Sequence, residues 1–295
     1  MNKKILVSLS VIAAVAAIVV GGTVAFFSDT ETSKGNTFTA GTLDLLVDSD
    51  CMYNGMECIN GYWNNVSETG NGCSCYFSEK NLTGSDLFFD FADVKPGDSG
   101  EDTISLHVVD NDAWACVQLG PLKNKDNGCN EPERKAEKAL HKGEPTCDGD
   151  PQGELGDNLY LTIWADYNCD NVWDGGNGGP GEPVLTSGPA NGDPLDGVTW
   201  TLADKDYNVF TGSGPLIGST TYCIGVAWNV PPGVDNIIQS DSVSGNIVFS
   251  AYQARNNNQF ACVERGGTLC CDGIDNDLDG NVDSADSGCV GVSCD

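Results

Sequence analysis

Short segments in which apolar and polar residues alternate recur along this chain of 295 residues, and they constrain its fold more than any other feature. Alternation with a period of two is typical of strands that bury one face. The predicted strands cover residues 42–47, 103–109, 158–165, 222–230 and 246–254. Clusters of Gly, Pro, Asn and Asp separate them, which predicts turns and loops of varied length. We therefore expect a mostly β protein, an antiparallel β-sandwich of jelly-roll type.

One set of alternating side chains in each predicted strand is expected to point into the core. These residues are Leu43, Leu45, Val47, Ile104, Leu106, Val108, Leu159, Leu161, Ile163, Tyr222, Ile224, Val226, Trp228, Ile247, Phe249 and Ala251. Four tryptophans also lie in strand-like runs, and we expect them in the core rather than on a carbohydrate-binding surface. They are Trp114, Trp164, Trp200 and Trp228.

Residues 130–142 have the features of one short surface helix. Asn130 is a good capping residue, acidic residues come early and basic residues come late, as the helix dipole favours. Cys129 and Cys147 flank the segment, which indicates that they fasten it to the sandwich. The predicted apolar face is small and consists of Ala136, Ala139 and Leu140.

The first 25 residues have the pattern of a secretory signal peptide. Two lysines precede an apolar run over residues 5–20, and small residues at Thr23 and Ala25 predict cleavage between Ala25 and Phe26. An uncleaved membrane anchor is the alternative, because about 20 apolar residues suffice to span a bilayer. No basic cluster follows the run, which favours cleavage. We expect a protein that is secreted or held at the cell surface and contacts the membrane only before cleavage.

An even number of cysteines behind a secretory signal predicts disulfides. Residues 51–85 form a Cys-rich insertion, for which a zinc site is the alternative, although no CxxC pair is present. The net charge of −29 argues against nucleic acid and anionic membranes as partners. The 14 cysteines are Cys51, Cys58, Cys73, Cys75, Cys116, Cys129, Cys147, Cys169, Cys223, Cys262, Cys270, Cys271, Cys289 and Cys294.

The C-terminal tail carries the clearest chemical pattern, an Asp-rich stretch with the spacing of a calcium-binding loop. Hard carboxylate and carbonyl oxygens at positions 1, 3, 5, 7, 9 and 12 suit Ca²⁺, and Gly280 allows the sharp turn. The predicted ligands are Asp275, Asp277, Asp279, Asn281, Asp283 and Asp286. We expect three regions: a signal peptide over 1–25, a sandwich domain over 26–262, and a disulfide-rich calcium-binding tail over 263–295.

A second, weaker loop of the same kind follows the predicted strand 158–165. Its position 12 is Asn177, a poor ligand, but Glu182 lies beyond a glycine-rich stretch that allows it to fold back. An acidic turn without an ion is an equally good interpretation. The candidate ligands are Asp166, Asn168, Asp170, Val172, Asp174 and Glu182.

The junction GGTVAFFSDTETS…NTFTAGTLDL, from Gly21 to Leu45, resembles the start of the TasA/camelysin family of secreted biofilm-matrix and fibre proteins. Weaker likenesses are a KPGD turn at residues 95–98 and a last core strand at 245–254. The tail, with cysteines around its Asp-rich loop, is similar to thrombospondin type 3 repeats. The family resemblance implies release by a SipW-type signal peptidase and self-association into filaments.

In TasA-like fibres the segment after the cleavage site completes the sheet of the next subunit. The resemblance therefore implies that Phe26, Phe27 and Phe38 belong to a donor strand. A monomeric calcium-binding adhesin or carbohydrate-binding module is the alternative, and a secreted camelysin-like hydrolase is a third. We expect no enzyme, because the chain has no HExxH and its two histidines, His107 and His141, are far apart in sequence.

Overall fold

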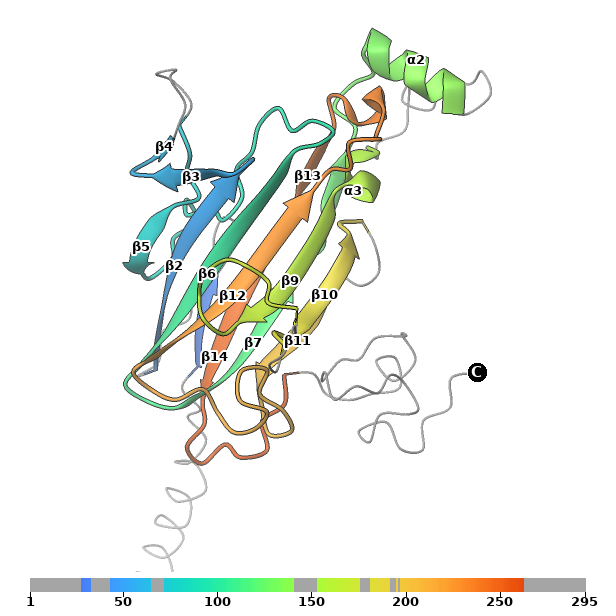
Figure 1. The fold of residues 1–295 in the computed structure, drawn as a ribbon. Helices are drawn as coiled ribbons and strands as arrows, with labels where there is room; N and C mark the ends of the chain where they lie inside the picture. Colours follow the sequence, from blue (N-terminus) through green and yellow to red (C-terminus); the bar gives the residue numbers. More distant parts are fainter. Residues whose placement is uncertain are drawn as a thin grey trace, which may run out of the picture.

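The computed structural model is mostly β, as predicted, and its strands form antiparallel sheets layered face to face (Figure 1). It describes residues 43–64, 72–140, 153–175, 181–191, 195 and 197–262, together with the backbone of residues 28–32. The signal peptide and the tail 263–295 lie outside these residues. The predicted jelly-roll connectivity stays a prediction.

The smaller sheet has four strands, which come from the N-terminal, middle and C-terminal parts of the chain. Its order is β1 (Ser28–Thr32), β14 (Ile247–Gln253), β7 (Ala113–Leu119) and β11 (Thr199–Ala203), and each neighbouring pair is antiparallel. Strands from opposite ends of the chain therefore lie next to each other.

The larger sheet has eight strands. Its order is β10 (Val184–Pro189), β9 (Tyr160–Asp166), β12 (Thr220–Asn229), β6 (Ser99–Val109), β2 (Asp44–Tyr53), β3 (Met56–Ile59) and β4 (Tyr62–Trp63), and β5 (Phe77–Lys80) pairs with β2 beside this path. Smaller elements lie near one end. They are β8 (Lys123–Lys125) paired with β13 (Ser242–Ser244), the helices α2 (Glu131–Leu140) and α3 (Leu155–Asn158), and the 3₁₀ turn η1 (Asn236–Ile238).

The core lies between the two sheets and takes side chains from both. The alternation predicted from the sequence is confirmed: nearly all of the residues expected to point inward are buried, and Leu159, Leu161 and Ile247 are half-buried. The four tryptophans expected in the core are buried as well. Period-two patterning therefore located the core strands because a two-layer sandwich buries one face of each strand.

Trp164 departs from the alternation, because it is buried together with its neighbours Ile163 and Ala165. Its indole lies across Gly225 of β12, its partner in register, and a Cβ at that glycine would come within 2.1 Å of the ring. Glycine is therefore required at position 225 for the indole to lie flat on the strand.

Four disulfides are present among the described residues, and they confirm the prediction for those cysteines. Cys51–Cys75 and Cys58–Cys73 close the Cys-rich insertion, Cys116–Cys262 joins β7 to the segment after β14, and Cys169–Cys223 joins the loop after β9 to β12. The zinc alternative for the insertion is wrong, because all four of its cysteines are paired. Cys129 is also disulfide-bonded. Cys147, Cys270, Cys271, Cys289 and Cys294 lie outside the described residues.

The predicted helix is present as α2, and it lies beyond the sheets at one end of the molecule (Figure 1). Its predicted apolar face is wrong in part. Ala136 is buried, but Ala139 and Leu140 are exposed, and the other buried side chains are Glu133 and Glu137. Within the described part of the chain, no helix is long and apolar enough to cross a membrane.

Candidate functional site

The outer edge of the four-stranded sheet is formed by β1, which comes from the segment just after the predicted cleavage site. Ser28 lies opposite Tyr252, and the register continues to Thr32 opposite Val248. Among the described strands, β1 has no second neighbour in the sheet. Its sequence, SDTET, is entirely polar. The pairing with β14 is thus a main-chain interaction at a sheet edge, and β14 would be the edge strand without it.

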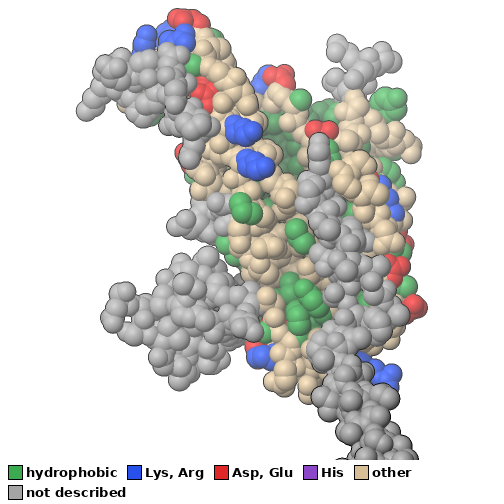
Figure 2. Space-filling view, turned by 180° about the vertical axis from the view of Figure 1, so that it is seen from behind, with side chains coloured by type: hydrophobic (Ala, Val, Ile, Leu, Met, Phe, Trp, Pro, Cys, Tyr) green, Lys and Arg blue, Asp and Glu red, His purple; other side chains and the backbone are tan. Residues whose placement is uncertain are grey.

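The other three strands of this sheet are free of charged side chains. β14, β7 and β11 contain no Asp, Glu, Lys or Arg, although the whole chain has a net charge of −29. In the view from behind, charged side chains gather at the α2 end and at the margins, and hydrophobic side chains appear between them (Figure 2). Natural edge strands usually carry charges that prevent pairing with other chains. β14 carries none, so it is suited to accept a strand.

The second predicted calcium loop begins at Asp166, at the end of β9. Asp166 is 1% exposed, and its two carboxylate oxygens accept hydrogen bonds from the backbone N–H groups of Cys169 (2.6 Å) and Asn171 (3.0 Å). Both of these residues have positive φ, at 58° and 61°. The Cys169–Cys223 disulfide ties the loop to β12. The loop is therefore tightly wound and fixed to the outer face of the larger sheet.

Glu182 folds back onto this loop. It is 6% exposed, and its carboxylate accepts hydrogen bonds from the N–H groups of Tyr167 (2.8 Å, Oε1) and Asp174 (2.8 Å, Oε2). The indole of Trp173 donates to the Glu182 carbonyl oxygen at 3.1 Å. One buried carboxylate thus joins both ends of the loop.

The remaining candidate ligands of the loop bond mainly to one another and to the backbone. The Asn168 amide donates to Asp170 Oδ2 (3.0 Å) and Asp174 Oδ2 (3.4 Å), and Asp170 Oδ1 accepts from the N–H of Val172 (2.9 Å). Among the described residues, the loop does not gather three carboxylates within 4.8 Å of one another. Hydrogen bonds and the Cys169–Cys223 disulfide account for its conformation, and calcium binding here stays a prediction.

Several predicted site residues lie outside the described residues. These are the six ligands Asp275, Asp277, Asp279, Asn281, Asp283 and Asp286, the donor-strand residues Phe26, Phe27 and Phe38, and Ala25 of the cleavage site. The calcium motif of the tail and its likeness to thrombospondin type 3 repeats therefore stay predictions.

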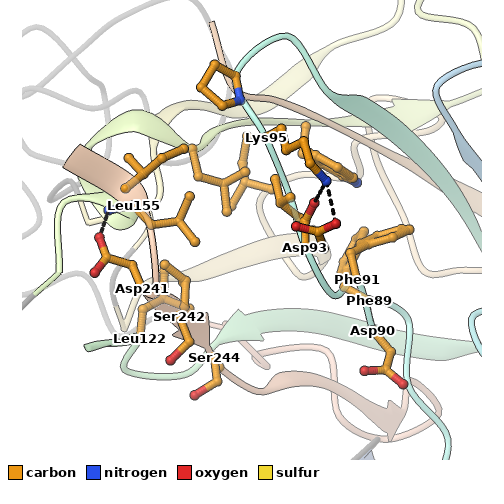
Figure 3. Close-up of a pocket in the computed structure, with 18 of the residues that line it drawn as sticks. Phe89, Asp90, Phe91, Asp93, Lys95, Leu122, Leu155, Asp241, Ser242 and Ser244 are labelled. Atoms are coloured by element: carbon orange, nitrogen blue, oxygen red, sulfur yellow. Dashed lines mark hydrogen bonds and ion pairs between the residues drawn. The ribbon is translucent and has the colours of Figure 1, made fainter. Parts of the chain in front are cut away.

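A groove of about 1090 Å³ lies at the end of the sandwich near α3, over the inner face of the larger sheet. The chain segments on its two sides are residues 87–96 and 235–247 (Figure 3). Phe89, Phe91 and Trp228 contribute aromatic surface, and Lys95 pairs with Asp93 at 2.5 Å. Asp98, at the end of the predicted KPGD turn, accepts a hydrogen bond from the N–H of Lys95 (2.7 Å). Sequence patterns did not predict the groove, because its sides are about 150 residues apart.

Three carboxylates that belong to no metal-binding sequence motif also converge. Asp126, Glu133 and Asp241 each place an oxygen within 4.8 Å of the other two. They are up to 115 residues apart in sequence, so no spacing pattern links them. The one local signal was Glu133, three residues after the helix cap Asn130, which is typical of a capping box rather than a metal site.

His107 is the one histidine among the described residues, and both of its ring nitrogens contact neighbouring side chains. Its Nε2 lies 2.7 Å from Asp48 Oδ2, and its Nδ1 lies 2.9 Å from the Thr221 hydroxyl. These contacts are cross-strand bonds between β6 and its two neighbours β2 and β12. They hold both ring nitrogens on the sheet surface and leave neither for a metal ion.

The antiparallel layers and their disulfides define the class: a disulfide-stabilised β protein of the kind found outside the cytoplasm. Residues 1–61 match the model of a protein family described as Camelysin metallo-endopeptidase, which confirms the resemblance of the N-terminal region to the camelysin family. No curated protein matches the chain. The family match and the disulfides together indicate an extracellular protein.

Proposed function

We propose that this protein is a structural subunit of extracellular filaments or biofilm matrix, and that subunits assemble by exchange of β1. The observation that supports the proposal most is the position of β1, a polar strand that completes the sheet at the uncharged edge strand β14. A strand that pairs in this way within one chain can make the same main-chain bonds to a neighbouring subunit.

The energetic difference between the two arrangements is small. The hydrogen bonds between β1 and β14 are the same in both, so exchange costs only the entropy of association, and a high subunit concentration offsets it. Apolar residues beside β1 would strengthen the association between subunits. Burial of Phe26 and Phe27 in the neighbouring subunit would contribute roughly 1.5–3 kcal/mol each.

Processing supplies the switch in this proposal. In the precursor the apolar N-terminal run holds the segment at the membrane, and cleavage after Ala25 by a SipW-type signal peptidase releases it. The acidic loops are proposed to bind Ca²⁺, at Asp275–Asp286 and more weakly at Asp166–Glu182. Calcium would lower the repulsion between subunits, because the chain is strongly acidic, with a net charge of −29 before cleavage.

A disulfide trap tests the exchange directly. Thr30 and Ser250 are partners in register, so the double variant Thr30→Cys/Ser250→Cys can form a new bond across the β1–β14 pair. If strands are exchanged, the new disulfide joins different chains, and oxidised filaments give a ladder of covalent oligomers on a non-reducing gel. A matched control, Thr30→Cys/Ser244→Cys, places the second cysteine in β13 and should give no ladder. Monomers alone in assembled Thr30→Cys/Ser250→Cys material would refute strand exchange.

The family description supports a second candidate, a metallo-endopeptidase. The His107 ring does not support this candidate, because both of its nitrogens contact other side chains. Incubation of the mature protein with casein and Zn²⁺ is the test, with a chelator as control. Cleavage that the chelator abolishes and that His107→Ala or His141→Ala removes would favour this candidate. If no cleavage occurs, the remaining alternative is a monomeric adhesin, which electron microscopy separates from a filament subunit.

A further inference from the structure

The buried side of α2 is acidic. Glu133 is 0% exposed and Glu137 is buried beside it, whereas Leu140 on the same helix is 58% exposed. Glu133 forms a capping box with Asn130: its Oε2 accepts from the Asn130 N–H at 3.1 Å, and the Asn130 side-chain oxygen accepts from the Glu133 N–H at 3.1 Å. The capping box explains one oxygen of Glu133 and leaves the other to be explained.

Two further carboxylates approach Glu133 from other parts of the chain. Asp126 lies between β8 and α2, and Asp241 lies between η1 and β13. The Ser240 hydroxyl lies 2.9 Å from Glu133 Oε2 and also contacts the carbonyl oxygen of Gly128, and Asp241 Oδ2 accepts a hydrogen bond from the N–H of Leu155 at 2.9 Å. Figure 3 shows Asp241 directed towards Leu155 at the side of the groove. One helix and two loops thus bring their carboxylates close together.

The cluster contains buried oxygens for which the described residues provide no hydrogen-bond donor. Glu133 Oε1 and Asp241 Oδ1 are buried without a hydrogen-bond partner. An unsatisfied buried carboxylate oxygen is costly, because its hydration is lost and not replaced. Within the described residues, no Lys or Arg forms an ion pair with Asp126, Glu133 or Asp241.

The pKa values of these carboxyl groups also indicate that no positive charge compensates them. Burial raises the pKa of Asp241 to about 6, although backbone hydrogen bonds oppose this, and Glu133 and Asp126 add to the rise. Burial likewise raises the pKa of Glu133, with further contributions from Asp126 and Glu137. Gly153 packs so closely on Asp241 that a Cβ there would come within 2.5 Å of its carboxyl carbon. The backbone therefore holds the carboxylate in place despite the repulsion.

We propose that Asp126, Glu133 and Asp241 form a calcium site that fastens α2 to the end of the sandwich. The donors are all oxygens, which selects a hard cation, and no His or Cys is among them. Oxygens on opposite sides of a calcium ion lie about 4.8 Å apart, because each Ca–O distance is about 2.4 Å. The three oxygens lie within 4.8 Å of one another, so one ion can contact all of them. The site is independent of β1 and of the two Asp-rich loops.

The test is hydrogen–deuterium exchange of the α2 backbone in the full mature chain, with Ca²⁺ and with a chelator. The variant Glu133→Gln/Asp241→Asn removes two ligand charges, and Glu131→Gln is the matched control, because Glu131 lies on the same helix with its side chain 87% exposed. At a Ca²⁺ concentration ten times Kd, α2 exchange should slow about tenfold in wild type and control, and not in the double variant.

The direction in which the double variant changes α2 exchange without calcium distinguishes a metal site from a cluster of carboxylates that only repel one another. With the chelator present, the double variant should exchange more slowly than wild type, because two repelling charges are gone; with Ca²⁺ present, it should exchange faster. Glu133→Gln alone serves if the double variant does not fold. The proposal is overturned if Ca²⁺ leaves α2 exchange in wild type unchanged, or if the double variant is slowed as much as wild type.

Discussion

The hydroxyl of Ser49 lies 2.8 Å from Asp102 Oδ1, on the inner face of the larger sheet, where Asp102 is 0% exposed. The same hydroxyl lies 2.6 Å from the carbonyl oxygen of Cys75. A hydroxyl has one proton and can donate to only one of these acceptors. A protonated Asp102 resolves the conflict, because its O–H then donates to Ser49, which in turn donates to Cys75.

Asp102 should therefore make the stability of the protein depend on pH. Burial raises its pKa well above the usual value, and Asp50 and Asp48 add to this, while Ser49 opposes it. A carboxyl group whose pKa is raised in the folded state does not lower the free energy of unfolding at pH values below its unfolded pKa, about 3.9. Its destabilising effect grows as the pH rises from there towards the folded pKa.

The variant Asp102→Asn should accordingly match wild type near pH 3.5 and exceed it at pH 7. Asn supplies the same donor to Ser49 without a titrating group. We expect a rise in Tm of several degrees at pH 7, at about 2–4 °C for each kcal/mol in a domain of this size. Thermal unfolding at several pH values measures it. Equal shifts at pH 3.5 and pH 7 would show that Asp102 does not titrate in this way.

Removal of residues 26–34 should leave a folded monomer. The core side chains that the structure describes begin at Leu43, so circular dichroism and the cooperative unfolding transition should persist. Assembly should be lost, because no strand remains to complete a neighbouring β14. Sedimentation at high concentration with Ca²⁺ provides the measurement, with the full mature chain as control. Monomers from both proteins would contradict the filament proposal.

Glu182→Ala should loosen the Asp-rich loop. The substitution leaves the N–H groups of Tyr167 and Asp174 without their acceptor, at a cost of about 1–3 kcal/mol for each group that stays buried. Hydrogen exchange of the N–H groups in residues 166–174 should accelerate, while the strands stay protected. Asp206→Ala, at a surface position outside the loop, is the control. Unchanged exchange in the loop would mean that Glu182 does not hold it.

Gly225→Ala should destabilise the larger sheet. The added methyl would meet the Trp164 ring at 2.1 Å, and such overpacking costs typically about 1–3 kcal/mol. Gly188→Ala is a matched control in the edge strand β10, since a Cβ there has no atom within 4 Å. Denaturant unfolding should shift for the first variant and hardly for the second. A neutral Gly225→Ala would show that the indole can move aside.

Calcium should bind to the tail. The double variant Asp275→Ala/Asp279→Ala removes two of the predicted ligands, and calorimetry should show the loss of one binding event relative to wild type. Chelation should expose the tail to proteolysis before the sandwich. Identical calcium heats in the two proteins would refute the site. The α2 variants, which leave the tail intact, provide the comparison that separates the two sites.

Elements whose causes are local could be predicted from the sequence. Alternation placed Leu43, Leu45 and Val47 inward because a strand turns every second side chain to the same face, and the position of Asn130 marked the start of α2. The number of cysteines and their position behind a signal peptide predicted that they form disulfides. The sequence did not predict which cysteines pair.

Which distant residues meet depends on how the sheets pack and cannot be predicted from the sequence. Asp126, Glu133 and Asp241 converge, and β1 lies beside β14 more than 200 residues away, because the sheets bring the two ends of the chain together. The acidic side of α2 faces inward against every local rule of amphipathic helices. Local spacing carries no information on such contacts, since they depend on how whole layers pack and on which groups are left to compensate a buried charge.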